Sequence, residues 1–230
     1  MNNSNESFQK NISDNLQKGE YKNVYANIES AVDIEFTKAL EAINDEKFDE
    51  SIEKALKTTS NGEQIYQGTA TAILVDIDGN VKAFYSNTPK DSELYATFAK
   101  ACFEKATARA FLKRQNIKGG IIQNSKLLEN NDYKRHDGAS IPTVNIDGVE
   151  YFIGVSGAMV DEEFTRRMLK TDENFNASNL EPEYSMWRAA GFWDFICATQ
   201  IRNYLINPDA KQEIGNVSIP TNFVDKPFFD

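Results

Sequence analysis

The sequence is poor in the side chains that bind metals and form disulfides. Its 230 residues contain one histidine, His136, and two cysteines, Cys102 and Cys197. A single histidine excludes a two-histidine metal site and any mechanism that needs two histidines. Because both cysteines lie in apolar surroundings at a spacing unlike that of a metal site, we expect buried thiols in a cytoplasmic protein rather than a disulfide.

The chain also lacks a long apolar run and an excess of positive charge. No stretch approaches the roughly 18 apolar residues that cross a bilayer, and residues 1–11 lack the basic and apolar regions of a secretory signal. Acidic residues outnumber basic ones by 35 to 25, which gives a net charge of −10. Since phosphates would be repelled, we expect no nucleic-acid partner and no membrane partner.

The negative charge lies entirely in the two ends of the chain. Residues 1–60 carry 12 acidic and 7 basic residues, residues 171–230 carry 9 and 4, and the middle is balanced at 14 of each. Both tryptophans and 10 of the 26 aromatic residues fall within 171–230. We therefore predict an acidic helical N-terminal extension over 1–45, a domain over 46–170, and an aromatic-rich C-terminal extension over 171–230 that packs on the domain or a neighbouring subunit.

The middle of the chain has the pattern of an α+β domain. Asp-Gly pairs at Asp78–Gly79 and Asp147–Gly148 separate β-rich segments and predict two hairpins, over 69–85 and 141–156. Helical spacing predicts helices over 46–59, with Asp45 as N-cap and Gly62 in a left-handed cap, over 92–115, from Asp161 onward, and over 184–205. The order of these elements indicates an antiparallel sheet covered by helices.

The domain contains an ordered series of short motifs: Val75–Val81, Lys105–Phe111, Gly138–Pro142, Ile146–Gly148, Gly154–Ala158 and the acidic pair Asp161–Glu162. In this order they resemble the motifs of the GlcG/HbpS-like family, which includes the C-terminal domain of PduO-type proteins. The resemblance covers about residues 46–170. It implies a profilin-like α-β-α sandwich with a five-stranded antiparallel sheet, assembly into homodimers or larger homo-oligomers, and the binding of haem or a corrinoid.

The loop before the second hairpin holds the candidate reactive groups. His136 has two functional interpretations, an axial ligand to haem iron or a general base, beside the alternative of a solvated loop histidine. Asp137 is a candidate for proton transfer together with His136. Arg109, on the helix over 92–115, suits a carboxylate ligand, or else belongs to a solvated helix face or an internal ion pair.

Other residues are candidates for lining a ligand pocket. The Gly-rich loop and the end of the second hairpin contribute backbone groups, and the C-terminal helix contributes aromatic rings. These candidates are Gly138, Ala139, Pro142, Gly154, Ser156, Gly157, Trp187 and Trp193. Each also has a structural interpretation, because small residues permit close backbone approach and aromatic residues at helical spacing often form core or interface.

These residues support two functional hypotheses and a third, structural one. The first is a cytoplasmic oligomeric protein that binds haem or a related planar small molecule between the sheet, the Gly138–Pro142 loop and the C-terminal helix. The second is a cofactor-free lyase, isomerase or hydratase acting on a small carboxylated metabolite, with His136 and Asp137 in proton transfer and the amides of Gly154–Gly157 stabilising an oxyanion. The third is a partner-binding subunit that uses its acidic flanks.

Overall fold

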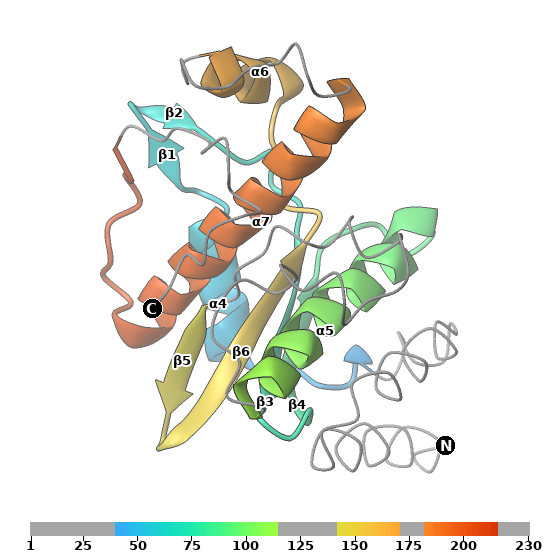
Figure 1. Cartoon of the computed structure of the whole chain (residues 1–230). Coiled ribbons are helices and arrows are strands. Elements are labelled where there is room, and N and C mark those ends of the chain that lie inside the picture. Colours follow the sequence, from blue (N-terminus) through green and yellow to red (C-terminus); the bar gives the residue numbers. More distant parts are fainter. Residues whose placement is uncertain (1–39, 115–141, 171–181, 216–230) are drawn as a thin grey trace.

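The computed structural model describes residues 40–114, 142–170 and 182–215 (Figure 1). Most of the predicted N-terminal extension therefore lies outside the described residues. The elements in chain order are α4 (Glu46–Ala55), β1 (Thr59–Ser60), β2 (Glu63–Gln64), β3 (Thr71–Asp76), β4 (Val81–Ser86), α5 (Glu93–Arg114), β5 (Thr143–Ile146), β6 (Val149–Ser156), α6 (Glu162–Lys170) and α7 (Pro182–Ile206).

Both predicted hairpins form and together make the main sheet. Its strand order is β4-β3-β6-β5, and every neighbouring pair is antiparallel. The turns use positive φ angles, 87° at Gly79, and 52° and 85° at Asp147 and Gly148, as the Asp-Gly pairs predict. The central strand β3 is buried along nearly its whole length. The mixture of helices with an antiparallel sheet confirms the α+β class.

The number of strands differs from what the family resemblance implies. Within the described residues the main sheet has four strands rather than five, and β1 and β2 form a separate two-stranded sheet. The sequence predicted a helix as far as residue 59, but α4 ends at Ala55 and β1 begins at Thr59. Gly62 has the predicted left-handed backbone, with φ of 76°, but in the turn of this small hairpin.

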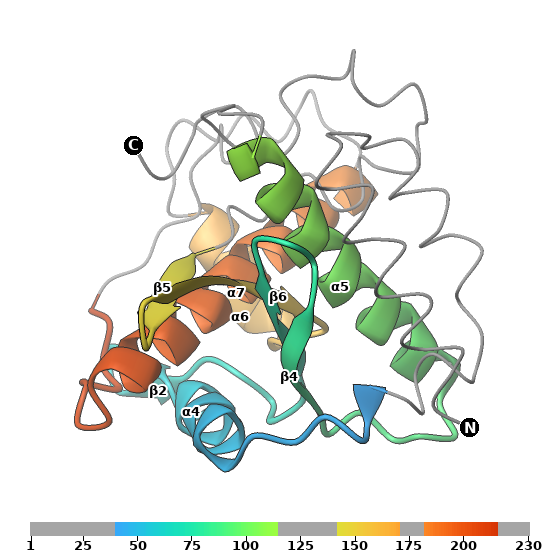
Figure 2. The ribbon, with the colours of Figure 1, turned by 90° about the horizontal axis from the view of Figure 1, so that it is seen from below.

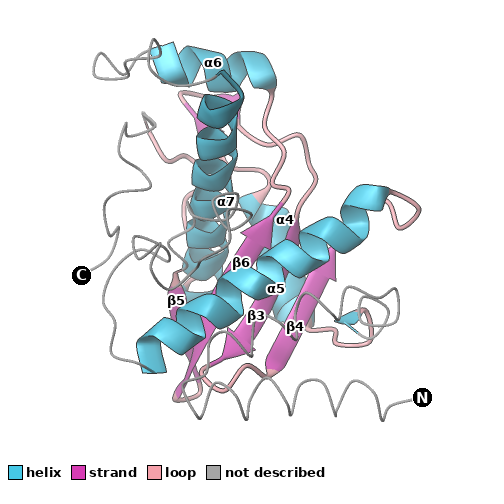
Figure 3. Ribbon diagram, turned by 45° about the vertical axis from the view of Figure 1, so that its right-hand side comes forward, coloured by secondary structure: helices cyan, strands magenta, loops and turns pink. Residues whose placement is uncertain are grey.

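Helices cover both faces of the main sheet (Figures 2 and 3). α5 crosses one face so closely that the backbone of Cys102 lies against Gly154 of β6. On the other face, Leu74 of β3 and Ile153 of β6 share a core with side chains of α4 and α7. The sheet is therefore the middle layer between α5 on one side and α4 with α7 on the other.

α7 belongs to this core along its described side chains. Eight of its residues are in the same buried cluster as those of α4: Phe192, Trp193, Phe195, Cys197, Ala198, Ile201, Tyr204 and Leu205. An aromatic-rich helix that is apolar on several faces can bury most of its surface only where other elements surround it. The described part of the C-terminal extension thus packs on the domain.

The local signals at helix starts act as the sequence predicts. Asp45 caps α4, its side chain accepting a hydrogen bond from the backbone N–H of Phe48 at 3.1 Å. Asp161 caps α6 in the same way, accepting from Phe164 at 2.9 Å. These bonds satisfy amides that a helix cannot pair internally. None of the described helices is both long and apolar enough to span a membrane.

Candidate functional site

Six of the eleven predicted site residues lie where the structure describes them fully. His136, Asp137, Gly138 and Ala139 are outside the described residues, and Trp187 is in α7 where side chains are not described. The remaining candidates are Arg109, Pro142, Gly154, Ser156, Gly157 and Trp193. Gly154 and Ser156 lie in the last part of β6, and Gly157 is the residue after it. Trp193 lies in the adjacent turn of α7.

The outer edge of β6 is only partly paired with β5. The paired residues of β6 end at Phe152, opposite Thr143, and one further bond joins the N–H of Ile153 to the carbonyl of Pro142 at 3.2 Å. Alternate residues of a strand direct their polar groups to the same edge, so the carbonyl of Val155 faces this edge beyond the end of β5. Here Lys105 of α5 donates to it from Nζ at 2.7 Å.

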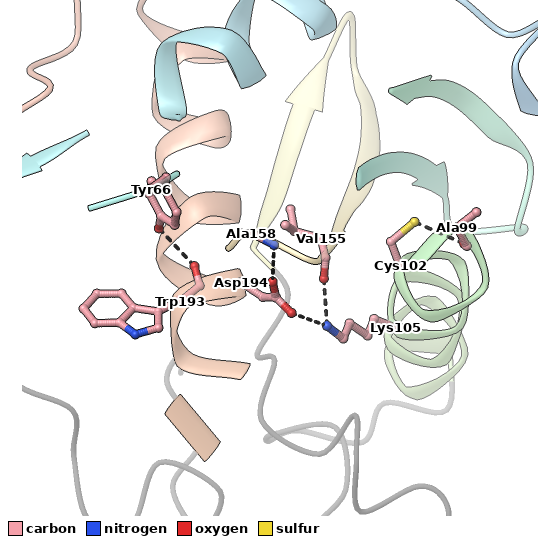
Figure 4. A network of polar contacts seen from close by, with 8 residues as sticks. All are labelled: Tyr66, Ala99, Cys102, Lys105, Val155, Ala158, Trp193 and Asp194. Carbon is pink, nitrogen blue, oxygen red and sulfur yellow. Dashed lines mark hydrogen bonds and ion pairs between the residues drawn. The ribbon is translucent and has the colours of Figure 1, made fainter. Parts of the chain in front are cut away.

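The same ammonium group forms a buried ion pair with α7. Lys105 Nζ lies 2.8 Å from Asp194 Oδ2, and the Lys105 side chain is only 4% exposed. The other carboxylate oxygen of Asp194 accepts a hydrogen bond from the N–H of Ala158 at 3.1 Å. Figure 4 shows Lys105 reaching from α5 past the end of β6 to Asp194. One network therefore joins α5, the end of β6 and α7.

Opposing effects act on the carboxyl group of Asp194. Burial raises its pKa above the usual value, while the charge and hydrogen bond of Lys105 and the amide of Ala158 lower it. A buried charge without a partner is far more costly than a paired one. The Asp194 carboxylate therefore depends on Lys105, and this dependence couples the position of α7 to that of α5.

This pair was not among the residues singled out from the sequence. Lys105 appears there only within a family-like motif, and Asp194 is not considered at all. The signal that would have found Asp194 is a lone charge in an otherwise apolar run, Phe192–Cys197. Asp is rarely buried unless it is paired, so such a residue in a core helix requires a cation from elsewhere in the fold.

Trp193 lies in the core beside this network. Its side chain is 1% exposed, and its ring packs edge-on to Phe192 and tilted against Phe164, with centroid distances of 5.2 and 5.6 Å. Its Nε1–H donates to the hydroxyl of Thr165 at 3.1 Å, and its carbonyl accepts from the hydroxyl of Tyr66 at 3.0 Å. Its neighbours and hydrogen bonds are thus those of a packed core residue.

The two glycines at the end of β6 are positions of close packing. A Cβ at Gly154 would overlap the carbonyl oxygen of Cys102, so α5 occupies the space over this residue. A Cβ at Gly157, where φ is 68°, would come within 2.5 Å of the ring of Phe98. The described amide here that binds a carboxylate is the N–H of Ala158, and the carboxylate is that of Asp194 in the same chain.

The two remaining candidates, Arg109 and Pro142, lie on α5 and directly before β5. Arg109 is half-buried on α5, one turn after Lys105; burial lowers the pKa of its guanidinium group, and the charge of Glu150 on β6 opposes this effect. Pro142 is buried at the start of β5. Arg109 thus supplies a partly desolvated positive charge, which the charge of Glu150 already stabilises in part.

The described residues hold few groups suited to a metal or to haem iron. They contain no cluster of three or more His, Cys, Asp or Glu side chains placed to bind a metal ion. Cys102 and Cys197 are free and buried, and burial raises the pKa of both thiols, so neither is a ready thiolate ligand. The axial ligand that the sequence predicts, His136, lies outside the described residues.

Comparison with known proteins adds no relative to this picture. No family model, no curated protein and no solved structure matches the chain.

Proposed function

We propose that this chain is a small-molecule-binding protein of the GlcG/HbpS-like kind, which takes haem or a related planar molecule. The observation that carries the proposal is a contact between two motifs of the resemblance that are 50 residues apart in the sequence. Lys105, which begins the segment Lys105–Phe111, donates to Val155 within Gly154–Ala158. The contact supports the proposal because it brings together two segments that the resemblance singles out.

The finer fold assignment belongs to the same proposal. The layered arrangement, with α5 on one face of the sheet and α4 and α7 on the other, supports a profilin-like sandwich. The fifth strand of that fold rests on the resemblance, because the main sheet has four strands within the described residues. Assembly into homodimers or larger homo-oligomers rests on the resemblance alone. Light scattering on the purified chain tests it directly by giving the mass of the particle.

The ligand site that we propose lies along α5 and the edge of β6, next to Pro142 and α7; the rest of the Gly138–Pro142 loop predicted to line it lies outside the described residues. Arg109 is the described residue that supports it most directly, because its charge is partly desolvated and would be stabilised by a propionate or another carboxylate. His136 is the side chain of this chain best suited to axial ligation, since a neutral imidazole binds haem iron well. Haem bound there would supply an iron centre for redox chemistry or for binding a small ligand.

Arg109 equally favours the second candidate, an enzyme acting on a small carboxylated metabolite. In that reaction Arg109 would hold the substrate carboxylate, with His136 and Asp137 transferring the proton. The predicted oxyanion role of the Gly154–Gly157 amides receives less support, because α5 covers Gly154 and Asp194 takes the neighbouring amide of Ala158.

Titration with haemin tests the binding proposal. The full chain should show a saturable Soret change at one haem per chain. His136→Ala should alter the Soret spectrum. Arg109→Gln should weaken binding by about tenfold, which corresponds to about 1.4 kcal/mol. Lys47→Gln is the matched control, because Lys47 is an exposed cation on α4. Absence of saturable binding would overturn the proposal, and a thermal shift produced by small organic acids in that case would support the second candidate.

A further inference from the structure

The small hairpin β1–β2 presents two backbone N–H groups in an unusual arrangement. Ser60 pairs with Glu63, so Asn61 and Gly62 form a two-residue loop, and both have positive φ angles, 54° and 76°. This is the geometry of a type I′ turn, which Asn-Gly favours. Successive amides in such a turn can point toward one anion. Here both donate to the carboxylate of Glu213, from Asn61 at 2.9 Å and from Gly62 at 3.3 Å.

The carboxylate of Glu213 receives two further hydrogen bonds. Thr59 donates from Oγ1 at 2.7 Å and Gly215 donates from its N–H at 3.1 Å. Each of the two carboxylate oxygens thus accepts two bonds. These bonds, led by that of Thr59, hold the pKa of Glu213 below its usual value although the group is exposed. The hairpin therefore recognises this group in its ionised form.

Backbone bonds align the segment around Glu213 with β1. The N–H of Thr59 donates to the carbonyl of Gln212 at 3.0 Å, and the N–H of Ile214 donates to the carbonyl of Thr59 at 3.1 Å. Ser60 adds a bond from its hydroxyl to the carbonyl of Gly215 at 2.5 Å. The pairing is parallel. Addition of an extended segment to a strand edge, with one side chain held in its own site, is a known mode of peptide recognition.

This segment connects α7 back to α4. After α7 ends, residues 207–215, which we name the C-terminal strap, run past the end of α4 to the hairpin (Figure 1). Lys54 of α4 donates to the carbonyl of Pro208 at 3.3 Å, and Gln200 of α7 donates to that of Lys211 at 3.4 Å. Ala210 and Ile214 are the strap residues whose partly buried side chains pack against the apolar core.

We propose that the β1–β2 hairpin is a recognition site for a carboxylate within an extended peptide, and that its ligand is the chain's own segment Gln212–Gly215. Glu213 locks the C-terminal strap onto the hairpin. Because most strap contacts are polar and solvent-exposed, and few apolar side chains are buried, the strap opens as a local unit without unfolding the core. The lock is independent of the ligand proposed for the α5 surface.

Hydrogen exchange measured by mass spectrometry on the full chain tests this proposal. Glu213→Gln removes the charge with little change of shape, and should speed exchange at the amides of Asn61, Gly62 and Gly215 by about tenfold, the change expected when charge-assisted bonds are weakened. Thr59→Val, which removes one donor, should act on the same amides. Asp209→Asn is the matched control, because Asp209 is another exposed carboxyl in the strap.

The specificity of the hairpin is tested with peptides added to the Glu213→Gln protein. A peptide with the sequence of residues 209–215 should restore slow exchange in the hairpin, and the same peptide with glutamine at the Glu213 position should not.

Equal exchange in the wild type, Glu213→Gln and Asp209→Asn proteins would overturn the proposal. So would faster exchange throughout α7 in Thr59→Val and Glu213→Gln, because the strap would then open only with the core. A concentration-dependent dimer of the wild type, with the strap of one copy on the hairpin of another, would overturn the intramolecular assignment.

Discussion

Replacing Lys105 by methionine should destabilise the protein strongly. Lys105→Met keeps most of the apolar stem but removes the donor to Val155 and the charge that faces Asp194. The Asp194 carboxylate then keeps only the amide of Ala158 as a bonding partner in the network. Removal of one partner of a buried ion pair typically costs about 3–5 kcal/mol. This is a large part of the roughly 5–15 kcal/mol that stabilises an ordinary domain.

The loss of stability should depend on pH in a particular direction. Burial already raises the pKa of Asp194, and without Lys105 two of the effects that lower it disappear. A carboxyl group whose folded pKa lies above its unfolded value favours folding at low pH, and this contribution is lost as the pH rises through the folded pKa. The pH range in which this stability is lost therefore begins just above 3.8, the ordinary pKa of an aspartate, and extends upward. The destabilisation by Lys105→Met should be larger at about pH 8 than at about pH 5.

Urea unfolding followed by tryptophan fluorescence and circular dichroism measures both effects. Trp193 is a suitable reporter because it is buried beside Asp194. Lys47→Met, at an exposed lysine of α4, is the matched control and should change stability by less than about 0.5 kcal/mol. The double variant Lys105→Met/Asp194→Leu should recover part of the loss, because no unpaired charge remains. A loss below about 1 kcal/mol at both pH values would refute the assignment of this pair as a buried, mutually dependent one.

Three other substitutions test the packing of α5 and the start of α4. Gly154→Ala should cost at least about 1–3 kcal/mol in urea unfolding, because its methyl group would overlap the backbone of Cys102. Gly157→Ala should cost about 1–2 kcal/mol of stability for its positive φ alone, and more because the new methyl group would contact the ring of Phe98. Phe98→Leu should therefore partly restore the stability of Gly157→Ala. No recovery would show that the ring is not the obstacle. Asp45→Ala should cost about 1 kcal/mol through loss of the N-cap, and an unchanged melting temperature would count against this cap.

Local sequence signals predicted most of the regular structure. The Asp-Gly pairs at Gly79 and Gly148 predicted both hairpins, because few residue pairs tolerate positive φ in a tight turn. The helix predicted over 92–115 is found at Glu93–Arg114, and the one over 184–205 at Pro182–Ile206. These elements follow from periodicity and turn chemistry, which act between neighbours in the chain.

The site was much less accessible from the sequence. Gly154 had two interpretations, a backbone group facing a ligand or a position of close packing, and in the structure it packs against α5. Trp193 likewise could have covered a ligand or belonged to the core, and it packs among Phe164, Phe192 and the core. In both cases the residue type indicates a close contact but not its partner, because the partner comes from an element far away in the sequence. The roles predicted for His136 and Asp137 stay predictions.

Gly62 shows where the sequence by itself stops and the tertiary structure begins to decide. The pair Asn61–Gly62 determines a left-handed backbone at this point, since glycine adopts positive φ without a steric cost. That backbone suits a helix end and a hairpin turn equally well. The hairpin is held by Glu213, 151 residues away from Gly62, whose carboxylate pairs with amides that a helix end would have used otherwise. The residue types of Asn61 and Gly62 determined the left-handed backbone. The hydrogen bonds to Glu213, which exist only in the folded chain, stabilise that backbone as a hairpin turn.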